Sequence, residues 1–137
     1  MFHFNSAFED QVQLSLNLVH YEKINPDTLP QPFQVNVADS ISISEKNENS
    51  LQTFIERKVS LEPAGLFSIM IRYEVVWKPK NWSLISDVDN TQIIQAMIAE
   101  KKDFLGSIAA RTCLLIAQLT TSLGLAPLIT PPELITK

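Results

Sequence analysis

The pattern of apolar and polar residues changes once along the chain, near residue 87. Before this point apolar residues recur at every second position, and after it they recur at helical spacing. Period-two alternation is typical of a strand with one buried face, whereas spacing at i, i+3 and i+4 is typical of an amphipathic helix. The sequence therefore predicts strands first and helices last.

Four segments carry the alternation: residues 12–18, 33–43, 53–62 and 67–77. A proline-rich loop over 25–32 follows the first segment, a polar turn over 45–50 the second, and a Pro-Ala-Gly turn the third. These connections are too short for crossover helices, except at the proline loop, and strands exposed on one face belong to antiparallel sheets. We expect a four-stranded antiparallel sheet.

Two helices are predicted after the strands. A short one covers residues 93–98, with Asn90 or Thr91 as its cap. A long one begins with Asp103 as N-cap and ends at Gly124, ahead of Pro127. A sheet whose helices gather at the C-terminal end and pack on one face is α+β, so residues 1–137 are expected to form one α+β domain.

The long helix is apolar around more than one stripe and carries almost no charge after Arg111. A helix of this kind is buried on two sides. One side is expected to pack on the sheet and the other on a second copy of the chain, with Leu115, Ile116 and Leu119 at that interface. The alternative is a central helix in a monomer.

Composition narrows the class of protein. Of 137 residues, 45% are hydrophobic and 19% charged, and the net charge is −4, which excludes a disordered chain and disfavours nucleic acid as a partner. Cys113 is the only cysteine, so neither an internal disulfide nor a Cys-rich zinc site is expected. With no secretory signal and no run of about 20 apolar residues, we expect a cytoplasmic protein that does not insert into membranes.

Candidate chemistry is sparse. The two histidines, His3 and His20, lack a ligand-spacing motif, and three glycines form no phosphate-binding loop. Asp87 and Asp89 suit either weak divalent binding or, more simply, a solvated turn and helix cap. Cys113 lies among leucines and isoleucines, where a small hydrophobic residue is the usual occupant. We therefore expect no enzyme, no catalytic residue, no metal and no cofactor.

Aromatic residues indicate a binding surface. Trp77 and Trp82 bracket a Lys-Pro-Lys-Asn loop, although Trp77 also suits the core face of its strand. Exposed aromatic residues beside a sheet edge suit an extended apolar peptide. The residues predicted to bind such a substrate are Trp77, Trp82, Phe67, Phe104 and Ile108.

Three stretches, in the order in which they follow one another along the chain, resemble the SecB family of export chaperones and its relatives in Gram-positive bacteria and phages. They are residues 91–97, the Ala-Arg-Thr-Cys of the long helix, and residues 123–132 with their prolines. Arg111 matches the helix arginine of that family, and Pro127 with Pro131 and Pro132 matches its tail. The resemblance implies a four-stranded antiparallel sheet with helices on one face, a homodimer or homotetramer, and ATP-independent holding of non-native polypeptides.

The expected function is thus a holdase for unfolded or preprotein chains, in protein export or beside an antitoxin. The alternative is a structural or adaptor protein of the same fold whose apolar surface serves only oligomerisation. SecB proteins usually continue through a second C-terminal helix that helps to contact the motor ATPase of secretion. Only five residues follow Pro132, so docking to that motor is not expected.

Overall fold

The computed structural model describes residues 2–23, 34–62, 67–122 and 127–135. Its elements in chain order are α1 (Phe4–Ala7), β1 (Phe8–Lys23), β2 (Gln34–Lys46), β3 (Leu51–Glu62), β4 (Phe67–Pro79), η1 (Trp82–Leu84), α2 (Asn90–Glu100) and α3 (Lys102–Ser122). The predicted proline loop over 25–32, the Pro-Ala-Gly turn and the helix stop at Gly124 lie outside the described residues.

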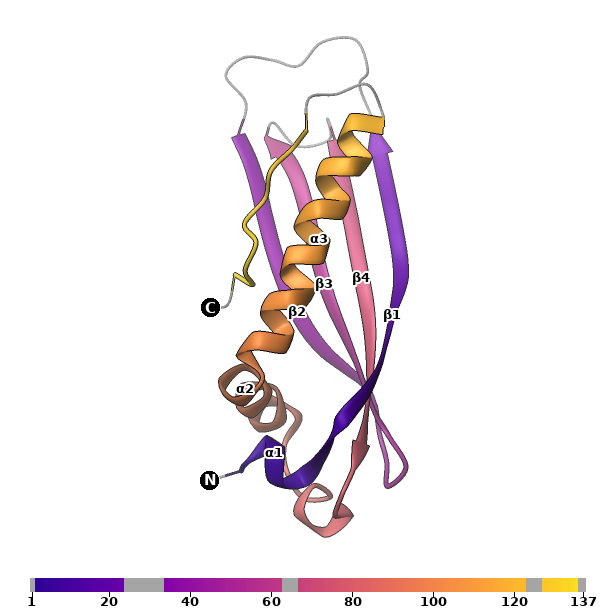
Figure 1. The fold of residues 1–137 in the computed structure, drawn as a ribbon, viewed down its shortest axis with the longest axis vertical. Helices are drawn as coiled ribbons and strands as arrows, with labels where there is room; N and C mark the ends of the chain where they lie inside the picture. Colours follow the sequence, from indigo (N-terminus) through magenta and orange to yellow (C-terminus); the bar gives the residue numbers. More distant parts are fainter. Residues whose placement is uncertain (1, 24–33, 63–66, 123–126, 136–137) are drawn as a thin grey trace.

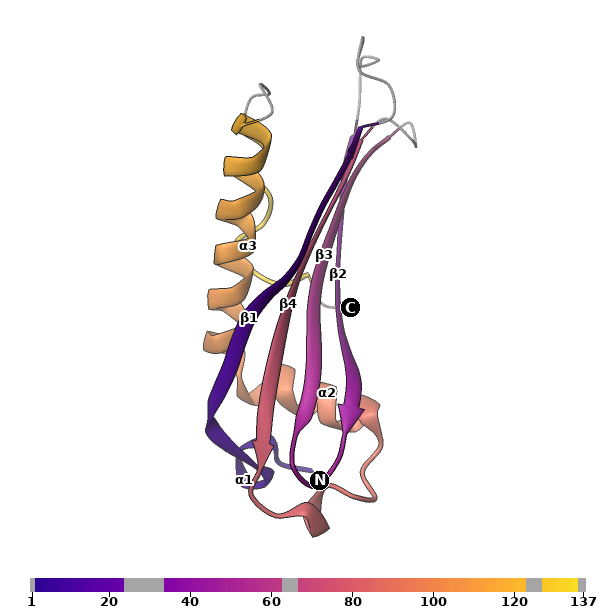
Figure 2. The same cartoon turned by 90° about the vertical axis from the view of Figure 1, so that its right-hand side faces the viewer.

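The four strands form one antiparallel sheet in the order β1-β4-β3-β2. Figure 1 shows an elongated sheet with α3 running along it, and Figure 2 shows that α3 lies on one side of the sheet. The α+β class, the four antiparallel strands and the long C-terminal helix are confirmed. The short α1 was not predicted.

Strands β3 and β4 bury alternate residues, as the period-two pattern predicts. In β1 a register shift between Leu16 and Leu18 breaks the predicted alternation, and Leu18 lies opposite Arg72 on the outer face. In β4 the helix-facing set is buried, while the residues between them point to the other face. On that outer face Arg72 forms an ion pair with Glu56 at 2.8 Å. The buried set of β4 consists of Ile69, Ile71, Tyr73, Val75 and Trp77.

The turn between β2 and β3 is built around one asparagine side chain. Asn47 Oδ1 accepts hydrogen bonds from the backbone N–H groups of Asn49 and Ser50, at 2.8 and 2.9 Å. This local bonding is why asparagine favours turns. The predicted polar turn is confirmed.

The helix starts differ from the predicted ones. Asp89, rather than Asn90 or Thr91, is the N-cap of α2, and its side chain makes no capping hydrogen bond. Helix α3 follows after Lys101 alone, so Asp103 lies inside the first turn instead of capping it. An acidic residue there still interacts favourably with the helix dipole. Caps depend on the backbone path, which periodicity does not specify.

An aromatic cluster closes the core at the end of the sheet near α1. The Phe4 ring stacks on Phe8 at 4.5 Å between centroids and meets Trp77 edge-on at 4.8 Å. Glu100 holds α1 in place, because its carboxylate accepts the backbone N–H groups of Phe4 and Asn5 at 2.7 and 3.0 Å. Burial raises the pKa of Glu100, but these bonds outweigh it and the net pKa lies below the ordinary value.

Helix α3 is the one described helix that is long and apolar enough to cross a membrane. The core helix of a soluble protein meets the same criterion, and α3 buries one face against the sheet. The outward face of α3 also carries apolar residues. One of them is Leu114, which is 60% exposed. The residues of α3 that are buried are Leu105, Ile108, Ala109, Thr112, Ile116 and Thr120.

Candidate polypeptide-binding site

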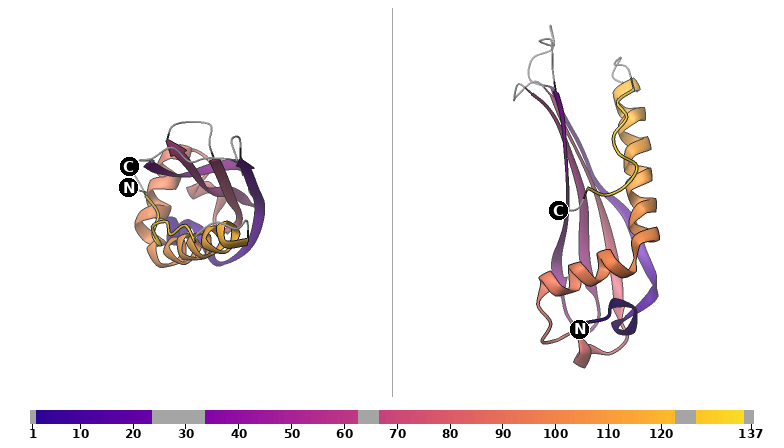
Figure 3. Two further views of the ribbon diagram at one scale, coloured as in Figure 1. Left: turned by 90° about the horizontal axis from the view of Figure 1, so that it is seen from above. Right: turned by 90° about the vertical axis from the view of Figure 1, so that its left-hand side faces the viewer.

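Residues 127–135, here the C-terminal tail, return from the end of α3 towards the middle of the sheet. Figure 3 shows the tail running beside α3 and then crossing to the strands. The segment is not part of a helix or strand, yet Thr130 is only 2% exposed. An irregular piece of chain, bent at Pro132 and Glu133, therefore bridges α3 and the sheet.

A buried ion pair on the sheet meets this tail. Arg57 of β3 and Asp39 of β2 are cross-strand partners and form two parallel hydrogen bonds, from Nε to Oδ1 at 2.7 Å and from Nη2 to Oδ2 at 2.8 Å. Their side chains are only 2% and 3% exposed. Two-point pairing of this kind fixes the plane of the guanidinium group. The fixed plane directs the remaining N–H groups of Arg57 at the tail.

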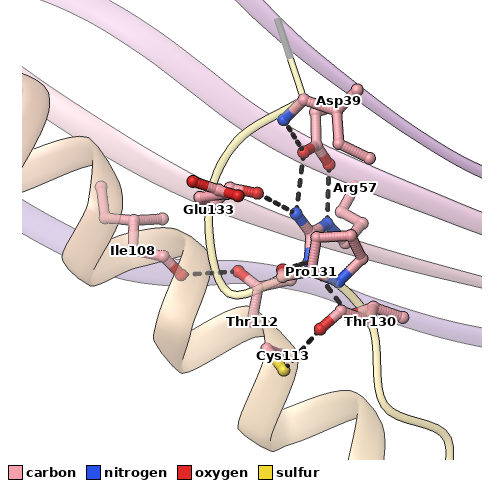
Figure 4. A network of polar contacts seen from close by, with 9 residues as sticks. Asp39, Arg57, Ile108, Thr112, Cys113, Thr130, Pro131 and Glu133 are labelled. Carbon is pink, nitrogen blue, oxygen red and sulfur yellow. Dashed lines mark hydrogen bonds and ion pairs between the residues drawn. The ribbon is translucent and has the colours of Figure 1, made fainter.

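Every N–H of Arg57 is used (Figure 4). Nη1 donates to Thr130 Oγ1 at 3.0 Å and to the Pro131 carbonyl at 2.6 Å, and Nη2 also donates to the Glu133 carbonyl at 2.9 Å. With the two bonds to Asp39, this accounts for all five donors of the guanidinium group. Three of the five depend on the tail.

The contacts with the tail are mainly main-chain contacts at alternate residues. Arg57 donates hydrogen bonds to the carbonyls of Pro131 and Glu133. Asp39 Oδ2 accepts a hydrogen bond from the backbone N–H of Ile135 at 2.8 Å. The chain bends at Pro132 and Glu133, and the bend brings these main-chain groups together on the Arg57–Asp39 pair.

Helix α3 holds the other side of the tail. Cys113 Sγ donates to the Thr130 carbonyl at 2.9 Å, and the Leu128 N–H donates to Thr120 Oγ1 at 2.9 Å. Leu128 and Leu134 are partly buried against the core. The tail is therefore held by main-chain hydrogen bonds on both sides and by two apolar side chains.

Sequence reasoning missed the Arg57–Asp39 pair, although a signal exists. Both residues occupy the apolar phase of their strands: Asp39 falls between Val37 and Ile41, and Arg57 follows Ile55 by two positions. A charge in that phase is buried and needs a partner. The tail itself gives no such signal, because its contacts with Arg57 span up to 76 positions of sequence.

The structure brings together three residues predicted to bind substrate, but inside the core. Trp77 and Phe104 meet edge-on at 5.4 Å between centroids, and Trp77 Nε1 donates to Thr53 Oγ1 at 3.2 Å. Trp77 is 1% exposed and Ile108 is fully buried. Within the folded chain these two side chains present no surface to a client.

The other predicted site residues are more dispersed. Trp82 is half-buried in η1, and the side chain of Phe67 lies outside the described residues. Of the predicted interface residues, Leu115 and Leu119 are half-buried, whereas Ile116 is fully buried on the sheet side of α3. Their role in oligomerisation stays a prediction. Arg111 is exposed, with no ion pair within the described part of the chain.

Apolar surface is left uncovered at the edge strand β1. Leu16 and Val19 lie opposite the buried Tyr73 and Ile71, so they belong to the helix-facing side of the sheet. They are nevertheless 47% and 42% exposed. The same sheet face that forms the core therefore continues outward as an open apolar strip, here the β1 strip, defined by these two residues.

Metal-ligating side chains and surface hollows in residues 2–23, 34–62, 67–122 and 127–135 bear on metal and small-molecule chemistry. No group of three or more His, Cys, Asp or Glu side chains there has the arrangement of a metal site. A surface hollow of about 380 Å³ lies between the N-terminal segment and the chain around the start of α2, and it is lined by Phe2, His3, Ser6, Leu84, Val88 and Gln92. The features described above are the apolar β1 strip and the main-chain hydrogen bonds of the tail with Arg57 and Asp39.

Neither a protein-family model nor a curated protein matches the sequence. Among solved structures, the fold matches the Mycobacterium tuberculosis Rv1957 SecB-like chaperone, solved in complex with a ChAD peptide from the Rv1956 HigA1 antitoxin. The TM-score is 0.60 and the identity 11%, over 88% of each chain. A Streptococcus agalactiae protein of unknown function also aligns, at TM-score 0.40 and 12% identity over 91% of this chain and 98% of that one. The fold is SecB-like, as the resemblance of the sequence implied.

Proposed function

We propose that the protein is a holdase, which binds non-native polypeptide segments without ATP and prevents their aggregation. The observation that carries this proposal is the exposed β1 strip on the core face of the sheet. β1 is also an edge strand. An edge strand with apolar side chains suits an extended apolar segment, because it offers unpaired main-chain groups and side-chain contacts together.

The SecB-like fold supports a polypeptide partner, since its neighbour was solved with a peptide of an antitoxin. The net charge of −4 suits a protein that must keep a bound apolar chain in solution. Protein export and control of an antitoxin are two settings in which such an activity is useful. The peptide bound by the neighbour favours the second setting.

We further propose that the protein works in the cytoplasm as a homodimer or homotetramer. The exposure of Leu114 supports an oligomer, because this side chain is 60% exposed on an apolar helix whose other face is already buried. Size-exclusion chromatography with light scattering measures the assembly. A tight oligomer that binds no polypeptide would favour the adaptor function instead.

The direct test is suppression of aggregation. A chemically denatured client is diluted into buffer with the protein at stoichiometric concentration and no nucleotide, and light scattering is followed. We expect the wild-type protein to suppress scattering. Failure with several clients at stoichiometric excess would contradict the proposal.

A matched pair of variants locates the activity. Leu16→Asp with Val19→Asp places two charges in the β1 strip, and we expect suppression to weaken by about tenfold in concentration. Gln13→Asp with Asn17→Asp adds the same charge at exposed polar positions of β1 and is expected to act like wild type. Equal activity of the two variants would exclude the strip as the contact surface.

A further inference from the structure

Residues 2–7, here the plug, close the aromatic end of the core with one buried ring. Phe4 is fully buried, and its ring stacks on Phe8 at 4.5 Å between centroids and meets Trp77 edge-on at 4.8 Å. Stacked and edge-on contacts both favour an aromatic occupant over an aliphatic one, because aromatic pairs gain energy beyond the area that they bury. Phe8 and Trp77 therefore form two walls of a pocket that fits an aromatic ring.

The plug is held in place by a small number of polar contacts. Its helix α1 has only four residues, which is too short for a helix to be stable by itself. The N–H groups of Phe4 and Asn5 donate to the carboxylate of Glu100 at 2.7 and 3.0 Å. Lys80 donates to the carbonyls of Asn5, through Nζ at 3.1 Å, and Ala7, through its backbone N–H at 2.8 Å. Two residues thus supply four hydrogen bonds to the plug.

The outward side of the plug is open to solvent. His3, Asn5 and Ser6 are exposed, and His3 and Ser6 also line the hollow of about 380 Å³. A short segment with exposed side chains and few polar contacts is of the kind that opens locally while the rest of a fold stays intact. Because α1 lies outside the sheet, its withdrawal uncovers the rings of Phe8 and Trp77 with the four strands still paired.

We propose that the plug is displaceable and that Phe4 occupies a binding pocket for an aromatic side chain of a client. In the closed state Phe4 fills the pocket, and in the open state an aromatic ring of the bound chain takes its place against Phe8 and Trp77. This inference rests on the proposed holdase function and adds to it an aromatic site distinct from the β1 strip. Trp77, which the sequence predicts to bind substrate, then contacts the client only in the open state.

Amide hydrogen exchange, measured by NMR, tests whether the plug opens locally. The amides of Phe4 and Asn5 report on the plug, and those of Ile71 and Val75 in the central strand β4 report on unfolding of the whole domain. Ile116→Ala weakens the core beneath α3, so we expect it to speed exchange in β4 at least tenfold and to leave the plug amides unchanged. Equal acceleration of both sets would show that the plug opens only with the whole fold, and would overturn the proposal.

A client with and without aromatic residues tests the pocket. The probe is a permanently unfolded polypeptide that contains phenylalanine, compared with the same polypeptide in which every aromatic residue is replaced by leucine. We expect a saturating amount of the aromatic client to speed exchange at Phe4 and Asn5 at least tenfold, because the client ring keeps Phe4 out of its pocket. The leucine client should leave both rates unchanged. This measurement uses the wild-type protein, so it does not depend on the folding of a variant. No change with the aromatic client, or equal acceleration by both clients, would overturn the proposal.

A matched pair of variants changes the population of the open state. Glu100→Gln removes the charge that holds the plug, and we expect the aromatic client to bind about fivefold more tightly, because apparent affinity rises with the fraction of protein that is open. Asp10→Asn is the control, since it removes the same charge from a residue that is 86% exposed and pairs with Lys101, and its affinity should equal that of wild type. Equal affinities of wild type and Glu100→Gln for the aromatic client would overturn the proposal.

The outcomes separate this inference from the holdase function. If both clients bind and the β1 strip is needed, but neither the plug amides nor the affinity of Glu100→Gln responds to aromatic residues, the inference fails and the holdase function stands. If wild type binds no client while Glu100→Gln captures the aromatic client alone, the pocket stands and the holdase function fails. If neither protein binds either client, both fail.

Discussion

Removal of Arg57 is the sharpest test of how the tail is held. Arg57→Met leaves the carboxylate of Asp39 buried at 3% exposure, with the Ile135 N–H as its one remaining hydrogen-bond donor in the described part of the chain. It also removes the donor to the carbonyls of Pro131 and Glu133. Breaking a buried pair by removing one partner typically costs about 3–5 kcal/mol. A domain of this size has an unfolding free energy of about 5–15 kcal/mol, so the loss is a large fraction of it.

The assay is urea denaturation followed by circular dichroism. With a slope of about 1.5 kcal/mol per M, the loss lowers the urea midpoint by about 2–3 M. Arg72→Met is the matched control, because Arg72 pairs with Glu56 on the outer face and is 31% exposed. A pair of that kind contributes about 0–1 kcal/mol.

A double variant identifies the cause of the loss. Arg57→Met combined with Asp39→Leu removes both charges, and it should be more stable than Arg57→Met alone by about 2 kcal/mol, since the unpaired buried carboxylate is gone. Equal midpoints for Arg57→Met and Arg72→Met, or no recovery in the double variant, would refute the reasoning.

Three further predictions concern the core and the start of the chain. Ile116→Ala opens a cavity in the core and should lower the free energy of unfolding by about 2–5 kcal/mol. Leu114→Ala, on the exposed face of α3, should lower it by less than about 0.5 kcal/mol. Similar urea midpoints for the two variants would contradict this packing. Thr53→Val removes the hydroxyl that accepts the hydrogen bond of the Trp77 indole N–H. It should lower the free energy of unfolding by about 1–3 kcal/mol and shift the tryptophan fluorescence. An unchanged urea midpoint and an unchanged spectrum would count against the buried hydrogen bond. Glu100→Gln should destabilise by about 1 kcal/mol at neutral pH. Because the native pKa of Glu100 is lowered, its stabilisation is present above the ordinary pKa and is lost as pH falls through the native pKa, so the two proteins should converge in acid; a difference that persists at pH 2 would refute this origin.

The strands were predictable because burial of one sheet face imposes a period of two on the sequence. In β4 the alternation from Ile69 to Trp77 matches burial residue by residue. The order of the strands was not predicted, since it depends on pairings between distant segments such as β1 with β4. Periodicity reports which face a residue is on, but not which strand lies beside it.

The site was predicted less well than the fold. Aromatic residues were expected to form the binding surface, but Trp77 and Phe104 pack against each other in the core. The exposed apolar surface instead includes aliphatic residues such as Leu16, which the strand pattern correctly placed on the core face without indicating that it is left 47% exposed. The amount of cover over each strand is a tertiary property.

Direct binding of an unfolded polypeptide tests the central claim, that the apolar surface of this chain holds other chains. A fluorescently labelled, permanently unfolded polypeptide is titrated with the protein in the absence of nucleotide, and anisotropy is recorded. We predict saturable binding that weakens by about tenfold when Leu16 and Val19 are both aspartate. No rise in anisotropy at any protein concentration would contradict the account.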